Sequence, residues 1–199
     1  MHINLEMLEC AHLICALLHE VPNMAFHKID PKKKIISRYF RRLLEYYDRQ
    51  DFAGPPENNR DHIIVASKAL GKGDWQTCTK LLLSLPFWRL VADADNVKSL
   101  ITTKIKEEGL RTYLFNFSSH YESLSLKQLS DIFELTTNTV HSIVSKMMIN
   151  EELHASWDQP TNTILLHGSE PTHLQQLALQ VILFDFLGTV GPYILSIIF

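Results

Sequence analysis

Apolar residues recur at helical spacing through most of the chain, and turn residues divide them into short amphipathic segments. Helices are predicted over 3–20, from Asp30-Pro31 onward, and over 57–70, 75–85 and 95–121. The first is expected to end at Val21-Pro22, because a residue before proline disfavours the α conformation. Residues 57–85, with a Gly-Lys-Gly-Asp turn inside them, are similar to one helical-hairpin repeat. The pattern therefore predicts a mainly α, TPR-like array.

The pattern changes between residues 125 and 168, where two short amphipathic helices precede a hairpin. Ser125 and Gln128 have the spacing of a capping box at the start of the first helix. Thr136 can cap the second helix, whose buried stripe is expected at Val140, Ile143, Val144, Met147 and Met148. Two short strands then flank the turn-rich residues 158–162. Helix, turn, helix and hairpin in this order predict a winged helix.

Composition supports an ordinary globular protein. The 199 residues are 46% hydrophobic and 21% charged, and the net charge is −3, so wholesale disorder and a general attraction to nucleic acid are not expected. The three cysteines have no CxxC spacing, which favours a reducing compartment such as the cytoplasm. No cationic segment precedes the apolar residues 13–18, so they are interpreted as part of a helix and not as a signal peptide.

Catalytic motifs are missing from the sequence. His19-Glu20 begins like the zinc motif HExxH, but Asn23 occupies the place of the second histidine. Glycine-rich nucleotide-binding motifs and GxSxG are also missing, and the ten histidines have no ligand spacing. We therefore expect no enzyme activity, no cofactor and no metal site.

The charge of the predicted winged helix argues against DNA reading. Residues 125–167 contain two lysines against five acidic residues, whereas a DNA-binding helix-turn-helix must neutralise several phosphates. The outward face of the second helix offers His141, Ser142, Ser145 and Lys146, a poor set for reading guanine. A winged helix that contacts protein is favoured, with a nucleic-acid-binding protein as the alternative.

Several stretches together resemble the PCI family, whose members are scaffold subunits of the proteasome lid, the signalosome and translation initiation factor three. Within it they are most similar to the family formed by the C subunits of the initiation factor. The stretches are LECAHLICALLHEVPNMA, GPPENNRDHIIVASKALGKGDWQTC, EEGLRTYLFNFSS, LSDIFEL, VHSIVSKMMINEELHASWDQPT and EPT with LALQ near the end. The family protein is several times longer than this chain.

The resemblance implies a helical-hairpin array fused to a C-terminal winged helix. It divides the chain into an array at 1–121, a winged helix at 122–168, a C-terminal helix at 169–180 and a divergent tail at 181–199. The implied function is a non-catalytic scaffold that docks other subunits and helps hold the complex on the small ribosomal subunit in translation initiation. Membership of another PCI complex is an alternative.

The hairpin suggests how docking would occur. A two-stranded wing leaves an outer strand with unpaired backbone groups, to which a neighbouring protein can add a strand. In PCI assemblies similar subunits lie side by side through their winged helices. The candidate interface residues are Trp157, Thr163, Ile164, Leu165 and Leu166. Alternatively, these residues pack only against the second helix of the winged helix.

A second candidate surface is the basic stretch 28–49, which has eight cations against three acidic residues and four interleaved aromatic residues. Cations and aromatic rings together suit RNA backbone and unstacked bases. The RNA-contact candidates are Lys32, Lys33, Lys34, Arg38, Arg41 and Arg42. The alternative is a solvated helix face around a buried aromatic stripe.

The last segment, residues 181–199, is apolar and has Asp185 as its only charge. Its length would just span a bilayer. Asp185 and the helix-weakening Gly188, Gly191 and Pro192 argue against an anchor, and no cationic residue follows. At this position the family continues as a mostly polar helix, so we expect a divergent C-terminus and no membrane association.

Overall fold

A computed structural model describes residues 4–27, 35–50, 54–91 and 93–167, together with Leu177. The chain divides into two compact units, residues 1–167 and 168–199. The predicted C-terminal helix at 169–180 lies outside the described residues except for Leu177, and the tail at 181–199 lies wholly outside them.

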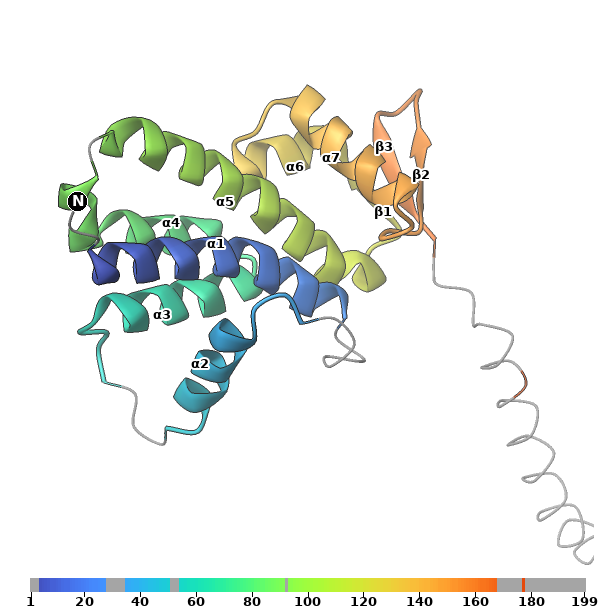
Figure 1. Cartoon of the computed structure of the whole chain (residues 1–199). Coiled ribbons are helices and arrows are strands. Elements are labelled where there is room, and N and C mark those ends of the chain that lie inside the picture. The colour runs from blue at the N-terminus through green and yellow to red at the C-terminus, as the bar shows by residue number, and fades with distance from the viewer. Residues whose placement is uncertain (1–3, 28–34, 51–53, 92, 168–176, 178–199) are drawn as a thin grey trace, which may run out of the picture. The chain divides into compact units, whose positions relative to one another are not determined.

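Helices form most of the first unit (Figure 1). The array consists of α1 (Leu5–Phe26), α2 (Arg38–Asp48), α3 (Asn59–Gly71), α4 (Trp75–Leu83), the 3-10 turn η1 (Pro86–Leu90), α5 (Ala94–Phe117) and η2 (Ser118–His120). The winged helix follows as β1 (Ser123–Ser125), α6 (Leu126–Phe133), α7 (Thr137–Ile149), β2 (Ala155–Asp158) and β3 (Thr163–Leu166). The predicted class, a helical array with a winged helix, is confirmed.

The hairpin of α3 and α4 forms as predicted. Gly73 has a φ of 88°, a left-handed conformation that favours glycine and reverses the chain between the helices. Asp74 begins α4, and its carboxylate accepts a hydrogen bond from the Thr77 amide at 3.0 Å. Local turn chemistry therefore explains this hairpin.

The end of α1 differs from the prediction. The helix passes through Pro22 and ends at Phe26, although an interior proline costs about 3 kcal/mol. Pro22 is itself buried, and the ring of Phe26 lies 5.2 Å from that of Phe115 on α5. Packing of this last stretch on the body of the molecule outweighs the local penalty.

The start of α2 also differs. The predicted start at Asp30-Pro31 lies outside the described residues, and Ile36, which falls inside the predicted helix, precedes the observed one and is 54% exposed. Ser37 is the N-cap, and its hydroxyl accepts a hydrogen bond from the Phe40 amide at 3.3 Å. The side chain of Glu20, on α1, accepts hydrogen bonds from the backbone amides of Ile36 and Ser37, which precede the helix.

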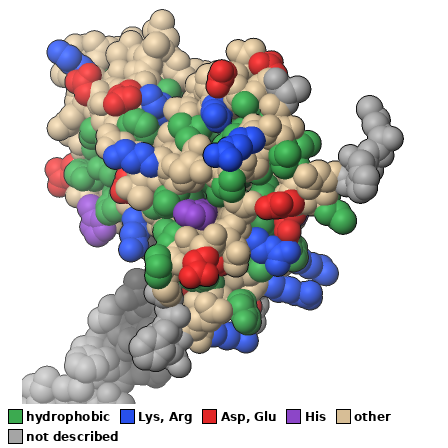
Figure 2. Space-filling view, turned by 90° about the vertical axis from the view of Figure 1, so that its left-hand side faces the viewer, with side chains coloured by type: hydrophobic (Ala, Val, Ile, Leu, Met, Phe, Trp, Pro, Cys, Tyr) green, Lys and Arg blue, Asp and Glu red, His purple; other side chains and the backbone are tan. Residues whose placement is uncertain are grey.

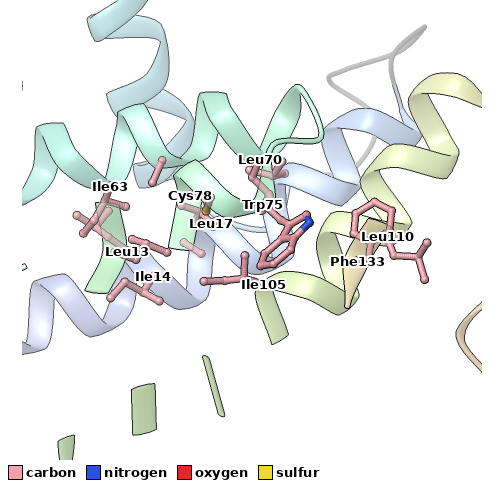
Figure 3. Packing of buried hydrophobic residues seen from close by; sticks show 14 of the residues in the cluster. Leu13, Ile14, Leu17, Ile63, Leu70, Trp75, Cys78, Ile105, Leu110 and Phe133 are labelled. Carbon is pink, nitrogen blue, oxygen red and sulfur yellow. The ribbon is translucent and has the colours of Figure 1, made fainter. Parts of the chain in front are cut away.

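One core runs through the array into the winged helix. Figure 3 shows side chains from α1, α3, α4 and α5 meeting together with Phe133 of α6. The fully buried members include Leu17, Leu70, Ile105 and Phe133. Because the two parts share this core, we describe residues up to His167 as one body.

Hydrogen bonds and ion pairs reinforce the junction between array and winged helix. The Trp75 indole N–H donates to the Ile132 carbonyl at 3.0 Å. Lys106 pairs with Glu134 at 2.9 Å. On α5, Arg111 pairs with Glu108 at 3.2 Å and with Glu152, which follows α7, at 2.9 Å. These contacts fix the winged helix from two sides.

Candidate protein-interaction surface

The helices of the winged helix form largely as predicted. Thr136 caps α7 by accepting a hydrogen bond from the Thr139 amide at 3.3 Å. Of the predicted stripe, Val140, Val144 and Met147 are buried, and Ile143 and Met148 are half-buried against the core. The predicted capping box at Ser125 does not form a side-chain bond, although Ser125 is the N-cap of α6. Ser125 instead pairs with Thr163 in the sheet, and the Leu126 amide donates to the Asn162 carbonyl at 3.1 Å.

The sheet has three strands in the order β1-β3-β2, both pairs antiparallel. The prediction of a two-stranded wing with β3 on its outside is therefore wrong. Residues 123–125, expected to be the approach to a helix, pair with residues 163–165 and cover that side of β3. The central strand has no edge left for a partner, and the candidates on β3 cannot act by strand addition.

The five candidate interface residues face different surroundings. Ile164 is fully buried, and Trp157 opposite it faces α7, where its ring stacks on His141 with centroids 4.3 Å apart. Leu165 is 39% exposed, on the other face of β3. Thr163 and Leu166 are half-buried on the same strand. The structure therefore brings the five residues into one sheet, but not onto one exposed surface.

Free strand edges remain on β1 and β2 within the described part of the sheet. The His167 amide donates to the His154 carbonyl, so the backbone N–H and C=O of His154 point toward β3. Because successive residues of an antiparallel strand alternate, the backbone N–H and C=O of Ala155 and Trp157 point away from β3. On β1, the Glu122 carbonyl accepts a hydrogen bond from the Leu166 amide. By the same alternation, the backbone N–H and C=O of Ser123 point outward. These outward groups are the ones that strand addition would use.

The outward surface of α7 is in contact with Trp157 of β2. The Trp157 indole N–H donates to the Ser145 hydroxyl at 3.1 Å, and the same ring covers His141. Two of the four residues that could have faced a DNA groove are thus engaged by β2. This geometry agrees with the charge argument against DNA reading.

Burial affects the charges next to this surface. Desolvation raises the pKa of Glu108 above its ordinary value, and the nearby guanidinium of Arg111 opposes the shift. Arg111 also reaches Glu152, between α7 and β2.

On the face of the molecule seen in Figure 2, acidic and basic side chains are interspersed with hydrophobic ones.

The RNA-contact candidates are separated by the structure. Lys32, Lys33 and Lys34 lie outside the described residues. Arg38 and Arg42 are exposed on α2, whereas Arg41 points inward, is only 12% exposed, and pairs with Glu20. The structure adds one residue to the exposed candidates for RNA contact, Arg49 at the end of α2.

Two residues that matter for this arrangement carry no distinctive signal in the sequence. Glu20 has the pattern of a solvated charge beside an apolar run, and Trp75 that of a residue at the start of a helix. An acidic residue between apolar neighbours carries no local sign that a distant helix will supply its partners. Only the fold places Glu20 against α2 and Trp75 against α6.

Within the described residues, His, Cys, Asp and Glu form no group that could hold a metal ion. Among those same residues, no helix combines the length and apolar character needed to cross a membrane.

Comparison with known proteins shows which family the chain resembles. The PCI domain model matches residues 88–167, and the model described as eukaryotic translation initiation factor 3 subunit 8 N-terminus matches residues 1–31. The chain is 50% identical over 185 residues to the C subunit of eukaryotic translation initiation factor 3 from Danio rerio, and the match covers 91% of this chain and 20% of the relative.

Other relatives carry the same name. The identity is 49% over 185 residues for the Xenopus tropicalis protein, covering 91% of this chain and 20% of the relative. It is 49% over 180 residues for the Yarrowia lipolytica protein, covering 89% and 22%. The chain thus spans about one fifth of the length of these relatives. Over the part that it spans, the chain belongs to the family of C subunits of eukaryotic translation initiation factor 3, and it contains that family's PCI domain.

Proposed function

We propose that the chain is a non-catalytic scaffold in translation initiation, working in the cytoplasm as part of initiation factor 3. The observation that carries this proposal is the close similarity to the C subunit of that factor over 91% of the chain. Its role would be to dock other subunits of the factor and to help hold the complex on the small ribosomal subunit. The chain needs no cofactor for such a role.

The docking contact is proposed at the outer edge of β2. This edge has two outward-pointing backbone amides, at Ala155 and Trp157, and strand addition uses such groups. The alternative edge on β1 is shorter and leads directly into α6. Leu165 and its neighbours on the outer face of the sheet would contribute side-chain contacts beside the added strand.

Substituting proline at the edge tests this contact. Ala155→Pro removes an outward amide without removing a bond between β2 and β3, because proline is tolerated where the N–H faces away from the sheet. We expect recovery of other initiation factor 3 subunits with the tagged chain to fall at least about tenfold, because strand addition loses one of the two main-chain bonds that the outward amides of β2 would donate. Affinity purification and quantitative mass spectrometry measure the recovery.

Ser123→Pro is the matched control, since it alters the free edge of β1 in the same way. It should leave recovery unchanged. Far-UV circular dichroism of both variants should match the parent chain. Equal recovery with Ala155→Pro and the parent chain would refute docking through β2, and loss only with Ser123→Pro would assign docking to β1.

A contact with RNA is proposed as a second activity. Arg38, Arg42, Tyr46 and Arg49, which we call the α2 strip, recur at spacings of three or four and are exposed along one helix face. Tyr46 is 67% exposed, and such a ring offers a stacking surface for an unpaired base. The strip can therefore combine phosphate contact with stacking.

Charge reversal tests the strip. We expect Arg38→Glu with Arg42→Glu to weaken binding of a labelled oligouridylate at least about tenfold, and to reduce the salt slope by about 1.4, since two phosphate contacts are lost. Fluorescence anisotropy at several salt concentrations gives both values. Arg89→Glu, an exposed position on η1, is the control. An unchanged slope in the double variant would refute the contact.

A further inference from the structure

Helix α2 packs against the body along a narrow ridge. Its buried side chains are Phe40 and Leu44 alone among its described residues. A cleft of about 370 Å³ lies on one side of the ridge, with Val21 and Met24 of α1 and Leu44 of α2 in its lining. Another, of about 450 Å³, separates Tyr47 from residues of α1 and α3. Leu43 and Tyr47 add partly buried contacts with the core. Apolar packing therefore holds this helix, which lies at the periphery in Figure 1, along one face that two clefts flank.

A buried carboxylate meets the beginning of α2. Glu20 has no exposed surface, and it accepts hydrogen bonds from the amides of Ile36 at 3.0 Å and Ser37 at 3.2 Å. Its other oxygen pairs with the Arg41 guanidinium, one turn into the helix. A negative charge here also suits the positive end of the helix dipole.

This arrangement fixes both the first residue of α2 and its rotation. With Arg41 turned toward Glu20, Arg38, Arg42 and Arg49 lie about 60–100° further round the helix and are exposed. Two further polar contacts join α2 to the body, Tyr39 to Glu9 at 2.6 Å and Asp48 to Lys68 at 2.5 Å, and both are exposed. Exposed pairs are worth little, whereas removing one partner of a buried pair is costly.

We infer that Glu20 is the positioning residue of α2: its buried carboxylate holds this helix against α1 and aims the α2 strip at solvent. The part concerning the strip rests on the proposed RNA contact, whereas the docking of α2 does not. The partners of Glu20 lie 16 to 21 residues away along the chain, across residues 28–34. Glu20 therefore acts on the strip through α2 and need not touch RNA.

Hydrogen exchange of the full chain tests the docking. Glu20→Gln keeps an oxygen that can accept an amide hydrogen bond but removes the charge that compensates Arg41. We expect exchange in residues 38–48 to rise at least about tenfold, while α3 and α5 keep their protection. Glu45→Gln, an exposed position on the same helix, should leave exchange unchanged.

A second substitution separates charge compensation from general damage. Glu20→Gln combined with Arg41→Met removes both charges and keeps the amide acceptor, so protection of α2 should return to within about threefold of the parent value. Unchanged exchange in Glu20→Gln would overturn the inference. A rise spread over α3 and α5, uncorrected in the double variant, would also overturn it, because the residue would then serve the core in general.

Binding of the oligouridylate probe examines the strip separately. If the parent chain binds the probe, Glu20→Gln should weaken binding about as much as Arg38→Glu with Arg42→Glu does, although the strip itself is intact. Unchanged binding together with raised exchange would overturn the aiming of the strip by Glu20. If the parent chain fails to bind, the RNA proposal fails, and the exchange data alone decide on the docking of α2.

Discussion

Gly109 lies in the middle of α5, where three large side chains close around its missing Cβ. A Cβ built there would lie 3.2 Å from the Trp75 Cβ, 3.5 Å from Leu70 and 3.6 Å from Phe133. In a helix interior, glycine is by itself unfavourable by roughly 1 kcal/mol relative to alanine. The structure supplies the reason for glycine, which lets α4 and α6 approach α5 closely.

Gly109→Ala should lower the free energy of unfolding by about 1 kcal/mol, because overpacking against the fixed Trp75 Cβ outweighs the gain in helix propensity. Gly71→Ala is the control, since its Cβ would meet nothing closer than 4.0 Å. It should leave stability unchanged or raise it slightly. Urea denaturation measures both. A stabilised Gly109→Ala variant would mean that α4 can shift away without cost.

At the scale of the element, two hydroxyl residues begin the two helices of the winged helix in different ways. Thr136 caps α7 through its side chain. Ser125 begins α6 without a side-chain bond, since the Leu126 amide finds the Asn162 carbonyl across the sheet. The same type of residue thus has a local role in one helix and a role in strand pairing in the other.

Thr136→Ala should reduce the free energy of unfolding by about 1 kcal/mol, the usual cost of losing a cap bond. Ser125→Ala should change it by less than about 0.5 kcal/mol, because only an uncommitted hydroxyl is removed. Chemical denaturation under identical conditions gives the comparison. Equal losses in the two variants would show that the Ser125 hydroxyl does cap α6 in solution.

At the scale of the whole molecule, the junction between array and winged helix decides how the sheet edge is presented. On one side the Trp75 indole reaches the Ile132 carbonyl, and on the other Arg111 reaches Glu152. The shared core, with Phe133 in it, lies between these contacts. A partner docked at β2 would therefore be held in a defined orientation relative to the array.

Trp75→Phe should loosen this junction, because it leaves the Ile132 carbonyl without its indole donor, at a cost of about 1–3 kcal/mol. We expect faster hydrogen exchange in residues 126–149. Trp88→Phe removes an equivalent indole bond, 2.8 Å to the Leu82 carbonyl, within the array. It should spare the winged helix, and equal effects of the two variants on residues 126–149 would contradict the role of Trp75.

Much of this molecule follows from sequence, for identifiable reasons. The turn at Gly73-Asp74, the cap at Thr136 and the stripe of α7 depend on neighbours within four residues, and all three form as predicted. The continuation of α1 through Pro22 could not be predicted, because it depends on contacts such as that of Phe26 with Phe115. The start of α2 depends likewise on Glu20.

The sequence by itself determined the helical class and the winged helix, and the acidic excess of residues 125–167 led to the prediction of a protein partner in place of DNA. The tertiary structure decided which surfaces are free. Pairing of β1 with β3 closes the strand expected to dock a partner and leaves the free edges of the described sheet on β1 and β2. Burial of Glu20 turns Arg41 inward and the α2 strip outward. Both outcomes depend on residues far apart in the chain meeting in space, which spacing and composition do not encode.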